Sequence, residues 1–224
     1  MSIIEQAEQG IDRIRQKTDT AILFCSFGKD SLVLLDLLAP KFKKVICVFM
    51  YFVKGLEHIE KYIRWATSKY DNIAIEQYPH WNLTYIMRSG LFCTRNPNVK
   101  TLKLTDINRA ICNKHNAEYS FFGMKKADSM NRRLMLNTYE NNENKGMVYP
   151  LADWRKKDIL SYIKLHKIPE PVMYSKKASG GCGFNIECFL YLRRHYPQDL
   201  NKILEAFPMS EKLLYDYDNK QKQE

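Results

Sequence analysis

The sequence predicts an α/β fold, in which a doubly wound, mostly parallel five-stranded sheet is followed by a C-terminal helical extension. The first observation is that apolar runs of strand length alternate with helix-patterned segments through most of the chain. The second lies in residues 20–39, where an apolar run, a glycine-containing turn and an apolar-periodic segment follow one another. With 224 residues, 45% of them hydrophobic, the chain can bury a core of this kind.

Five apolar or alternating segments are expected to form the strands. They are residues 21–25, 45–52, 72–78, 118–124 and 147–151. Helical periodicity between them predicts helices at residues 56–70, 81–90, 104–116, 129–141 and 154–166. A further helix is expected before the first strand, and another opens at Leu32, after the turn at residues 26–31 that follows this strand. Asp153 is expected to cap the helix at residues 154–166.

The composition changes after Pro169. Residues 175–183, SKKASGGCG, form a basic and glycine-rich stretch. Three more helices are predicted, at residues 184–196, 198–207 and 209–216. We therefore expect an α/β domain at residues 1–168, with a loop and C-terminal helices at residues 169–224 packed on it.

The charge balance narrows the function classes. Lys and Arg number 35 and Asp and Glu 25, a formal net charge of +10. This suits a phosphate-rich ligand, either a nucleotide or a nucleic acid, although many basic chains are simply soluble. The chain has no apolar window of bilayer length and no signal-peptide pattern at its start, so we expect a cytoplasmic protein without a membrane partner. The six cysteines do not look like a disulfide framework, and Cys25 and Cys47 are expected in the core.

Residues 26–31, SFGKDS, follow the first strand and could form a phosphate site. A helix N-terminus offers unpaired N–H groups and the positive end of the helix dipole. Gly28 would let a ligand approach the backbone, Lys29 would add positive charge, and Ser31 could donate a hydrogen bond to a phosphate oxygen. Asp30 could hold a metal ion or order the loop. The alternative is an ordinary strand-to-helix turn.

A second polar loop, residues 123–132, follows the fourth strand. Lys125, Lys126 and Arg132 could neutralise a polyphosphate, and Gly123 would permit its close approach. Ligands of open α/β sheets bind beyond the carboxyl ends of the strands, so we expect the loops after the first and fourth strands to lie close together. The alternative interpretation is the basic, solvent-exposed start of a helix. Because two phosphate-type loops occur at the positions that a doubly wound sheet requires, this alternative is much weaker.

Three segments resemble one known family. Residues 26–31 are similar to the SGGxDS loop of the PP-loop superfamily, with Phe27 at the place of the middle glycine. Residues 123–132 resemble the GIRRxxSxxR segment of the phosphoadenylyl-sulfate (PAPS) reductase family, with Ser129 and Arg132 at matching positions. Residues 149–162 are similar to its PLxDWxxxDV..Y stretch. The resemblance runs from about residue 21 to residue 174 and implies the adenine nucleotide alpha hydrolase-like fold of the PP-loop ATP pyrophosphatases.

The resemblance implies an adenine nucleotide, either ATP or PAPS, with its phosphates on the first loop. Magnesium would bridge phosphate oxygens, with Asp30 as a possible ligand. Lys29 and Arg132 are the expected catalytic cations. The full set of expected nucleotide-binding residues is Ser26, Phe27, Gly28, Lys29, Asp30, Ser31, Gly123, Lys125, Lys126, Ser129 and Arg132.

The leading hypothesis is an enzyme that cleaves ATP between the α and β phosphates and adenylates an acceptor, in sulfur-transfer or nucleic-acid-modification chemistry. The first alternative is a PAPS reductase-like oxidoreductase that uses Cys182 as its nucleophile and a thioredoxin-like donor. The reductases that this chain resembles carry an ECGLH-type tail cysteine, which the final residues LLYDYDNKQKQE lack, and this favours adenylation. The second alternative is a nucleotide- or nucleic-acid-binding module without turnover, in which Phe27 blocks the in-line geometry.

The remaining cysteines are compatible with a metal site. Cys182 and Cys188 could join Cys93 or Cys112 around zinc or an iron–sulfur cluster, which needs four ligands. Cys112 and His115 have ligand-like spacing, although that spacing also suits helix packing. Cys188 is expected inside a helix, where a core position is the simpler interpretation. A homodimer is compatible with the sequence, which does not specify the oligomeric state.

Overall fold

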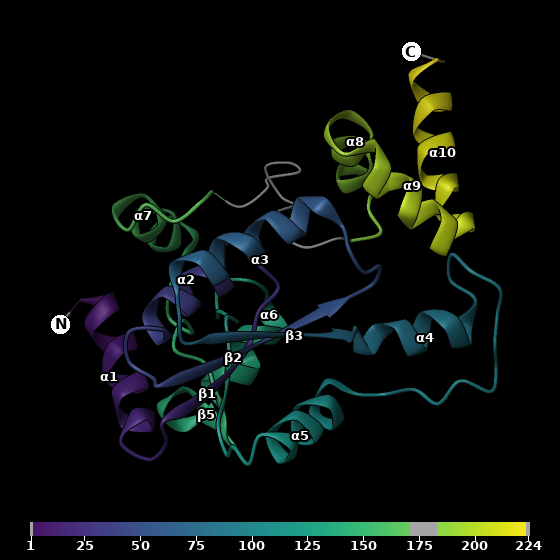
Figure 1. Ribbon diagram of the computed structural model, residues 1–224. Helices are drawn as coiled ribbons and strands as arrows, with labels where there is room; N and C mark the ends of the chain where they lie inside the picture. Colours follow the sequence, from purple (N-terminus) through teal and green to yellow (C-terminus); the bar gives the residue numbers. More distant parts are fainter. Residues whose placement is uncertain (1, 171–182, 223–224) are drawn as a thin grey trace.

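The computed structural model describes residues 2–170 and 183–222 and confirms the doubly wound α/β fold (Figure 1). The strand order is β3-β2-β1-β4-β6-β5. β1 (Thr20–Phe24) lies in the middle and pairs in parallel with β2 (Lys44–Tyr51) and β4 (Ser120–Phe122). β3 (Ile73–Pro79) extends the parallel sheet beyond β2. The order reverses between β1 and β4, so the switch point lies where the sequence predicts it.

The far edge of the sheet contains one strand more than predicted. β6 (Met147–Val148) pairs in parallel with β4, and β5 (Glu143–Asn144) pairs with β6 in the antiparallel direction. The turn between them has positive φ at Lys145 and Gly146, 50° and 78°. A two-residue strand in a polar segment has no apolar alternation, so the pattern rules do not detect it.

The helices lie close to their predicted positions. They are α1 (Ile3–Arg15), α2 (Lys29–Leu38), α3 (Glu57–Lys69), α4 (Trp81–Ser89), α5 (Leu104–Lys114), α6 (Met130–Asn137), α7 (Lys156–Leu165), α8 (Ile186–His195), α9 (Pro197–Ala206) and α10 (Lys212–Gln221). Two 3₁₀ turns, η1 (Glu140–Asn142) and η2 (Pro208–Glu211), complete the described helical structure. None of the described helices is long and apolar enough to span a membrane.

Two apolar cores cover the two faces of the sheet. Successive residues of β1 alternate between them, because strand side chains point to opposite faces. Ala21 and Leu23 enter the larger core, which also contains buried residues of α1, α2, α3 and α7. Ile22 and Phe24 enter the smaller core with Ile111 of α5 and Leu136 of α6. Buried residues of α8, α9 and α10 belong to the larger core as well.

The predicted cap of α7 is wrong. The helix begins at Lys156, and the Asp158 carboxylate accepts a hydrogen bond from the Arg155 N–H at 2.7 Å. Asp153 instead pairs with Lys126, at 2.8 Å between Oδ1 and Nζ. Residues 151–153 form a turn before the helix, in which Leu151 and Ala152 are buried and Asp153 is exposed, and this turn moves the helix start past Asp153.

A buried carboxylate joins the C-terminal helices to the α/β layers. Asp199 of α9 is 1% exposed and accepts hydrogen bonds from the N–H groups of Glu57 and His58, each at 2.9 Å. Its Oδ2 also lies 2.8 Å from His58 Nδ1. These N–H groups belong to the first turn of α3, so Asp199 caps that helix from a distant part of the chain.

Candidate functional site

The two predicted phosphate loops meet at the carboxyl edge of the sheet. Phe24 and Phe122, which end β1 and β4, are register partners. A Cβ added to Gly123 would lie 3.4 Å from the backbone carbon and the Cβ of Asp30. The predicted adjacency is therefore confirmed, because even a Cβ at position 123 would be in van der Waals contact with the first loop.

The N-terminus of α2 faces this edge without a side-chain cap. Gly28 is the N-cap residue, and the first helical hydrogen bond runs from the Leu32 N–H to the Gly28 carbonyl at 3.0 Å. The helix therefore begins at Lys29, three residues earlier than predicted, and the N–H groups of residues 29–31 precede its first bond. Ser31 Oγ donates to the Gly28 carbonyl at 3.0 Å and lies 3.4 Å from the hydroxyl of the exposed Ser26.

Phe27 does not obstruct this loop. Its backbone has a φ of 54°, so its side chain turns inward, where it is 1% exposed. The ring contacts Phe49 edge-on, with 5.7 Å between ring centroids. The ring belongs to the core, which argues against the hypothesis that Phe27 blocks the in-line geometry.

The backbone geometry of Phe27 predicts that substitution by glycine destabilises the protein no more than substitution by alanine, the reverse of the usual order. Phe27→Ala should cost about 3 kcal/mol or more through the lost core volume. Phe27→Gly loses the same ring but relieves the left-handed backbone, which costs a non-glycine residue about 1 kcal/mol. We expect urea unfolding to show Phe27→Gly at least as stable as Phe27→Ala. A glycine variant about 1 kcal/mol less stable than the alanine variant, the usual order, would contradict the left-handed conformation.

An ion network centred on Lys125 joins the two loops. Its side chain is 2% exposed, and Nζ lies 2.7 Å from Asp30 Oδ1 and 2.9 Å from Asp128 Oδ1. The other oxygen of Asp30 pairs with Lys29 Nζ at 2.8 Å. Burial raises the pKa of Asp128, but the Lys125 ammonium and N–H outweigh burial and hold that pKa below its ordinary value. Lys125 is thus a buried bridge between the loops.

The other predicted residues of the second loop have separate positions. Arg132 is 45% exposed and pairs with Asp128 through Nη1 at 2.6 Å. Ser129 is the N-cap of α6, and its Oγ accepts a hydrogen bond from the Arg132 N–H at 3.2 Å. Lys126 points to Asp153. Arg132 is therefore the most exposed of the three second-loop cations, at 45% against 2% for Lys125 and 27% for Lys126.

A small cavity adjoins the first loop and was not predicted. It encloses about 160 Å³, and its lining includes Ser26, Phe49, Phe52 and His80. The rings of Phe52 and His80 stack at 4.5 Å between centroids. Burial lowers the pKa of His80, so its ring is neutral at pH 7. Phe52 directly follows the carboxyl end of β2, and His80 directly follows that of β3. Their position at this edge of the sheet is the signal by which the sequence could have identified them as site residues.

Comparison with known proteins identifies the family. A model of the phosphoadenosine phosphosulfate reductase domain matches residues 20–196, most of the chain. The chain belongs to this family. No curated protein sequence has significant similarity to the chain.

Three solved structures are similar to this member of the phosphoadenosine phosphosulfate reductase family. NH3-dependent NAD synthetase from Campylobacter jejuni has a TM-score of 0.50 and 15% identity, covering 96% of this chain and 95% of that one. PAPS reductase from Candida auris, in a phosphate complex, has a TM-score of 0.50 and 17% identity, covering 76% and 82%. The U34-tRNA thiolase NcsA from Methanococcus maripaludis, with its 4Fe–4S cluster, has a TM-score of 0.48 and 14% identity, covering 95% and 79%.

None of the described cysteines belongs to either loop. Cys182 lies outside the described residues, and Cys188 is fully buried in α8. Burial raises the pKa of Cys25 to about 11 and also raises that of Cys47. His115 Nε2 lies 3.0 Å from Glu76 Oε1, so this residue with ligand-like spacing already has a partner. Within residues 2–170 and 183–222, no three His, Cys, Asp or Glu side chains gather as a metal site.

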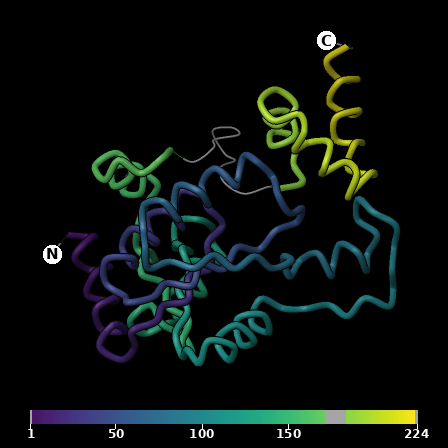
Figure 2. The backbone as a smooth tube through the Cα atoms, in the orientation of Figure 1, coloured from purple at the N-terminus to yellow at the C-terminus, as the bar shows by residue number. Residues whose placement is uncertain are grey.

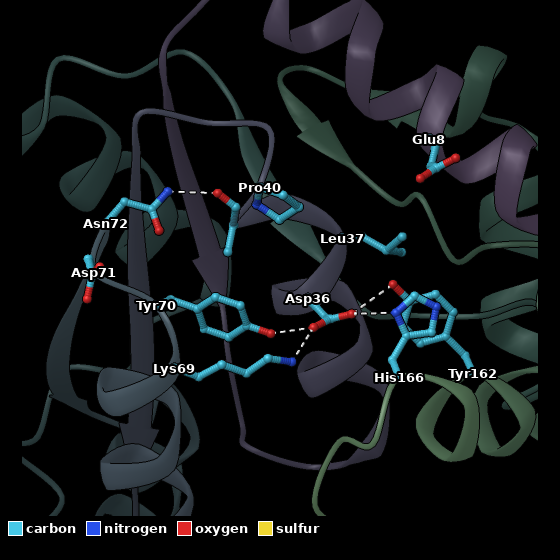
Figure 3. A pocket seen from close by; sticks show the side chains of 11 residues that line it. Glu8, Asp36, Leu37, Pro40, Lys69, Tyr70, Asp71, Asn72, Tyr162 and His166 are labelled. Carbon is cyan, nitrogen blue, oxygen red and sulfur yellow. Dashed lines mark hydrogen bonds and ion pairs between the residues drawn. The ribbon is translucent and has the colours of Figure 1, made fainter.

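A larger cavity, of about 580 Å³, lies at the opposite edge of the sheet (Figure 3). At its centre, Asp36 of α2 accepts hydrogen bonds from Tyr70, from Lys69 at 2.7 Å and from Tyr162 at 2.9 Å. These donors come from the end of α3 and from α7. Burial raises the pKa of Asp36, but its donors outweigh burial and hold that pKa low. The cluster fastens three helices together and lies away from both loops.

Proposed function

We propose that this chain binds ATP at the carboxyl edge of the sheet and transfers its adenylyl group to an acceptor, with release of pyrophosphate. One observation supports this proposal most. The buried Lys125 joins the N-terminus of α2, which has no side-chain cap, to the cation-rich second loop. An N-terminus and fixed cations together bind a polyphosphate better than either alone. Membership of the family supports an adenine nucleotide as the ligand.

The cavity beside Ser26 gives the nucleotide an orientation. The adenine ring would enter among Phe49, Phe52 and His80, where aromatic faces can stack on it. The phosphates would then extend over Ser26 to the N–H groups of residues 29–31. Arg132 would reach them with its exposed guanidinium, while Lys125 holds the two loops together.

The proposed reaction is an in-line displacement at the α phosphorus. A nucleophilic atom of the acceptor forms a bond to this phosphorus, and the bond to the α–β bridging oxygen breaks. Pyrophosphate leaves with that electron pair, and the acceptor loses a proton. Charge grows on the leaving oxygens, where helix N–H groups and Arg132 would stabilise it.

Magnesium does not fit directly on Asp30. Both carboxylate oxygens face ammonium groups, Oδ1 at 2.7 Å from Lys125 and Oδ2 at 2.8 Å from Lys29. A metal ion there would have to displace a lysine. The proposed reaction therefore contains no step that depends on a metal bound to Asp30.

The described thiols favour adenylyl transfer over reduction. Burial raises the pKa of Cys25, Cys47, Cys93 and Cys112, and a raised pKa reduces the nucleophilic thiolate. Cys25 directly precedes Ser26, so the cysteine next to the first loop is among these protonated thiols. The reductase alternative depends on Cys182.

Thermal shift with ATP, ADP, AMP, PAPS and adenosine 3′,5′-bisphosphate tests the proposal. A nucleotide at about one hundred times its Kd should add about 2.7 kcal/mol to the free energy of unfolding. We expect this shift with ATP, an affinity loss of roughly tenfold in Arg132→Ala and Lys29→Ala, and almost none in Arg133→Ala. Arg133 is the matched control, an exposed arginine of the same helix.

Pyrophosphate release in the presence of an acceptor would establish turnover. A shift with PAPS and the bisphosphate, but not with ATP, would contradict the proposal in favour of the reductase, with Cys182→Ser as the deciding variant. Equal affinity in Arg132→Ala, Lys29→Ala and wild type would contradict the assignment of the site.

A further inference from the structure

Residues 81–109 form a basic arm that the nucleotide site does not explain. The arm consists of α4, the segment 90–103 and the first turns of α5. Its cations are Arg88, Arg95, Lys100, Lys103 and Arg109, and all five are exposed. Asp106 is its only carboxylate. The arm therefore holds four of the ten net positive charges in about one eighth of the chain.

The positive charge of the arm is not neutralised within the described residues. None of its five cations forms an ion pair there, whereas Lys125, Lys126 and Arg132 of the second loop all do. The single carboxylate is also occupied, because Asp106 Oδ2 accepts a hydrogen bond from the Lys103 N–H at 3.0 Å. Such an unbalanced cationic surface is complementary to a polyanion.

Exposed apolar side chains are interleaved with these cations. Tyr85 is 57% exposed, Leu91 46%, Met87 43% and Leu102 41%. Tyr85 and Arg88 are three residues apart on α4 and share one face. Alternation of aromatic or apolar surface with cations suits unpaired bases and phosphates together, because the bases stack while the backbone is neutralised. A duplex hides its base faces and would not use the apolar part.

Hydrogen bonds within the arm hold its segments together, and the arm begins beside the proposed nucleotide site. The Asn96 N–H donates to the Met87 carbonyl at 2.8 Å, and the Leu102 N–H donates to Thr84 Oγ1 at 3.0 Å. Figures 1 and 2 show α4 continuing outward from the end of β3 and the chain returning alongside it to α5. His80, the N-cap of α4, lines the cavity beside Ser26. A strand lying along α4 would thus end at the proposed adenine pocket.

We propose that the basic arm binds a single-stranded nucleic acid and leads one of its nucleotides to the carboxyl edge of the sheet. Strand binding depends only on the arm, whereas the role of the bound nucleotide as acceptor rests on the proposed function. The shared chemistry is a phosphodiester backbone with unpaired bases, which RNA and DNA both provide.

Fluorescence anisotropy with labelled oligonucleotides tests the proposal on the full chain. The probes are a mixed-sequence single-stranded RNA, the single-stranded DNA of the same sequence, and the duplex of each. The arm variant is Arg88→Glu with Lys100→Glu. The control variant is Lys157→Glu with Lys164→Glu, which makes the same change in net charge at exposed lysines of α7 that have no described ion pair. Arg88 and Lys164 both lie in the last turn of their helices.

We expect a single strand to bind more tightly than its duplex, and the arm variant to bind it at least tenfold more weakly than the control variant. The slope of log affinity against log salt should become about 1.4 shallower in the arm variant, at about 0.7 for each lost phosphate contact. The better of the RNA and DNA single strands identifies the natural polymer.

Three results would overturn the proposal: no single-strand binding at low salt, tighter binding of the duplexes, or equal losses in the two variants. ATP-induced thermal shift in the same variants separates this proposal from the previous one. We expect both variants to keep the ATP shift, because neither changes a loop residue. Strand binding without any ATP shift would support the arm and contradict the adenylation site.

Discussion

Lys125→Met should lower the melting temperature by roughly 6–12 °C and abolish the ATP-induced shift. The substitution leaves Asp30 and Asp128 facing each other across the position of a buried ammonium. Removing one partner from a buried ion network costs about 3 kcal/mol, because the remaining charges stay desolvated. For a chain of this size, each 1 kcal/mol corresponds to about 2–4 °C. Differential scanning calorimetry with and without ATP measures both effects.

The neighbouring lysine provides the control. Lys126 pairs with Asp153, but the two side chains are 27% and 48% exposed, so Lys126→Met should cost less than about 1 kcal/mol. Adding Asp128→Asn to Lys125→Met should recover part of the lost stability, because one uncompensated carboxylate disappears. Equal losses in Lys125→Met and Lys126→Met would show that Lys125 is not a buried bridge.

Asp199→Ala should destabilise the protein by about 3 kcal/mol in urea unfolding. The carboxylate caps α3 with two backbone hydrogen bonds and contacts the buried ring of His58. Its removal takes away the acceptor of the two backbone N–H groups and breaks the link between α9 and α3. Asp218→Ala is the control, since the Asp218–Arg193 pair is 45% and 43% exposed and should contribute less than about 1 kcal/mol.

The buried His58–Asp199 pair also predicts that the stability of the protein depends on pH. Burial lowers the pKa of His58 below its ordinary 6.5, so the unfolded chain binds the proton more readily. Burial raises the pKa of Asp199, but hydrogen bonds from His58 and Glu57 hold it below its usual value of 3.8. The free energy of unfolding of the wild type should therefore fall as the pH drops below about 6.5, where His58 takes up a proton on unfolding. It should fall again below about pH 3.8, where Asp199 does the same. A protein of constant stability between pH 7 and pH 4, or an Asp199→Ala variant as stable as Asp218→Ala, would contradict this account.

The sequence predicted the elements that depend on periodicity. The buried strands β1 and β2 and the helices around them follow directly from apolar spacing, and the adjacency of the two loops follows from parallel topology. β5 was missed because two polar residues carry no pattern. The start of α7 was misplaced because Asp153 and Asp158 are equally good capping residues in sequence, and only the turn at residues 151–153 decides between them.

The sequence predicted which residues lie in the two loops of the candidate site, but not which of them are buried and which are exposed. Lys125 and Lys126 are adjacent and chemically identical in sequence, yet one is buried between two carboxylates and the other lies at the surface. Phe27 occupies a loop position, but its positive φ sends the ring into the core. His80 and Phe52 belong to no recognised motif. Burial and backbone conformation are tertiary properties, so local pattern could not supply them.

The place of β1 in the sheet has a kinetic consequence. Its contacts with β2 join residues about 24 positions apart, whereas its contacts with β4 join residues about one hundred positions apart. Because distant pairings form more slowly than local ones, we expect the β1–β2–β3 half to assemble before β4 docks. The candidate site lies across the late junction. Recovery of nucleotide binding should therefore lag behind the recovery of secondary structure during refolding, and the ligand would report the last stage of assembly.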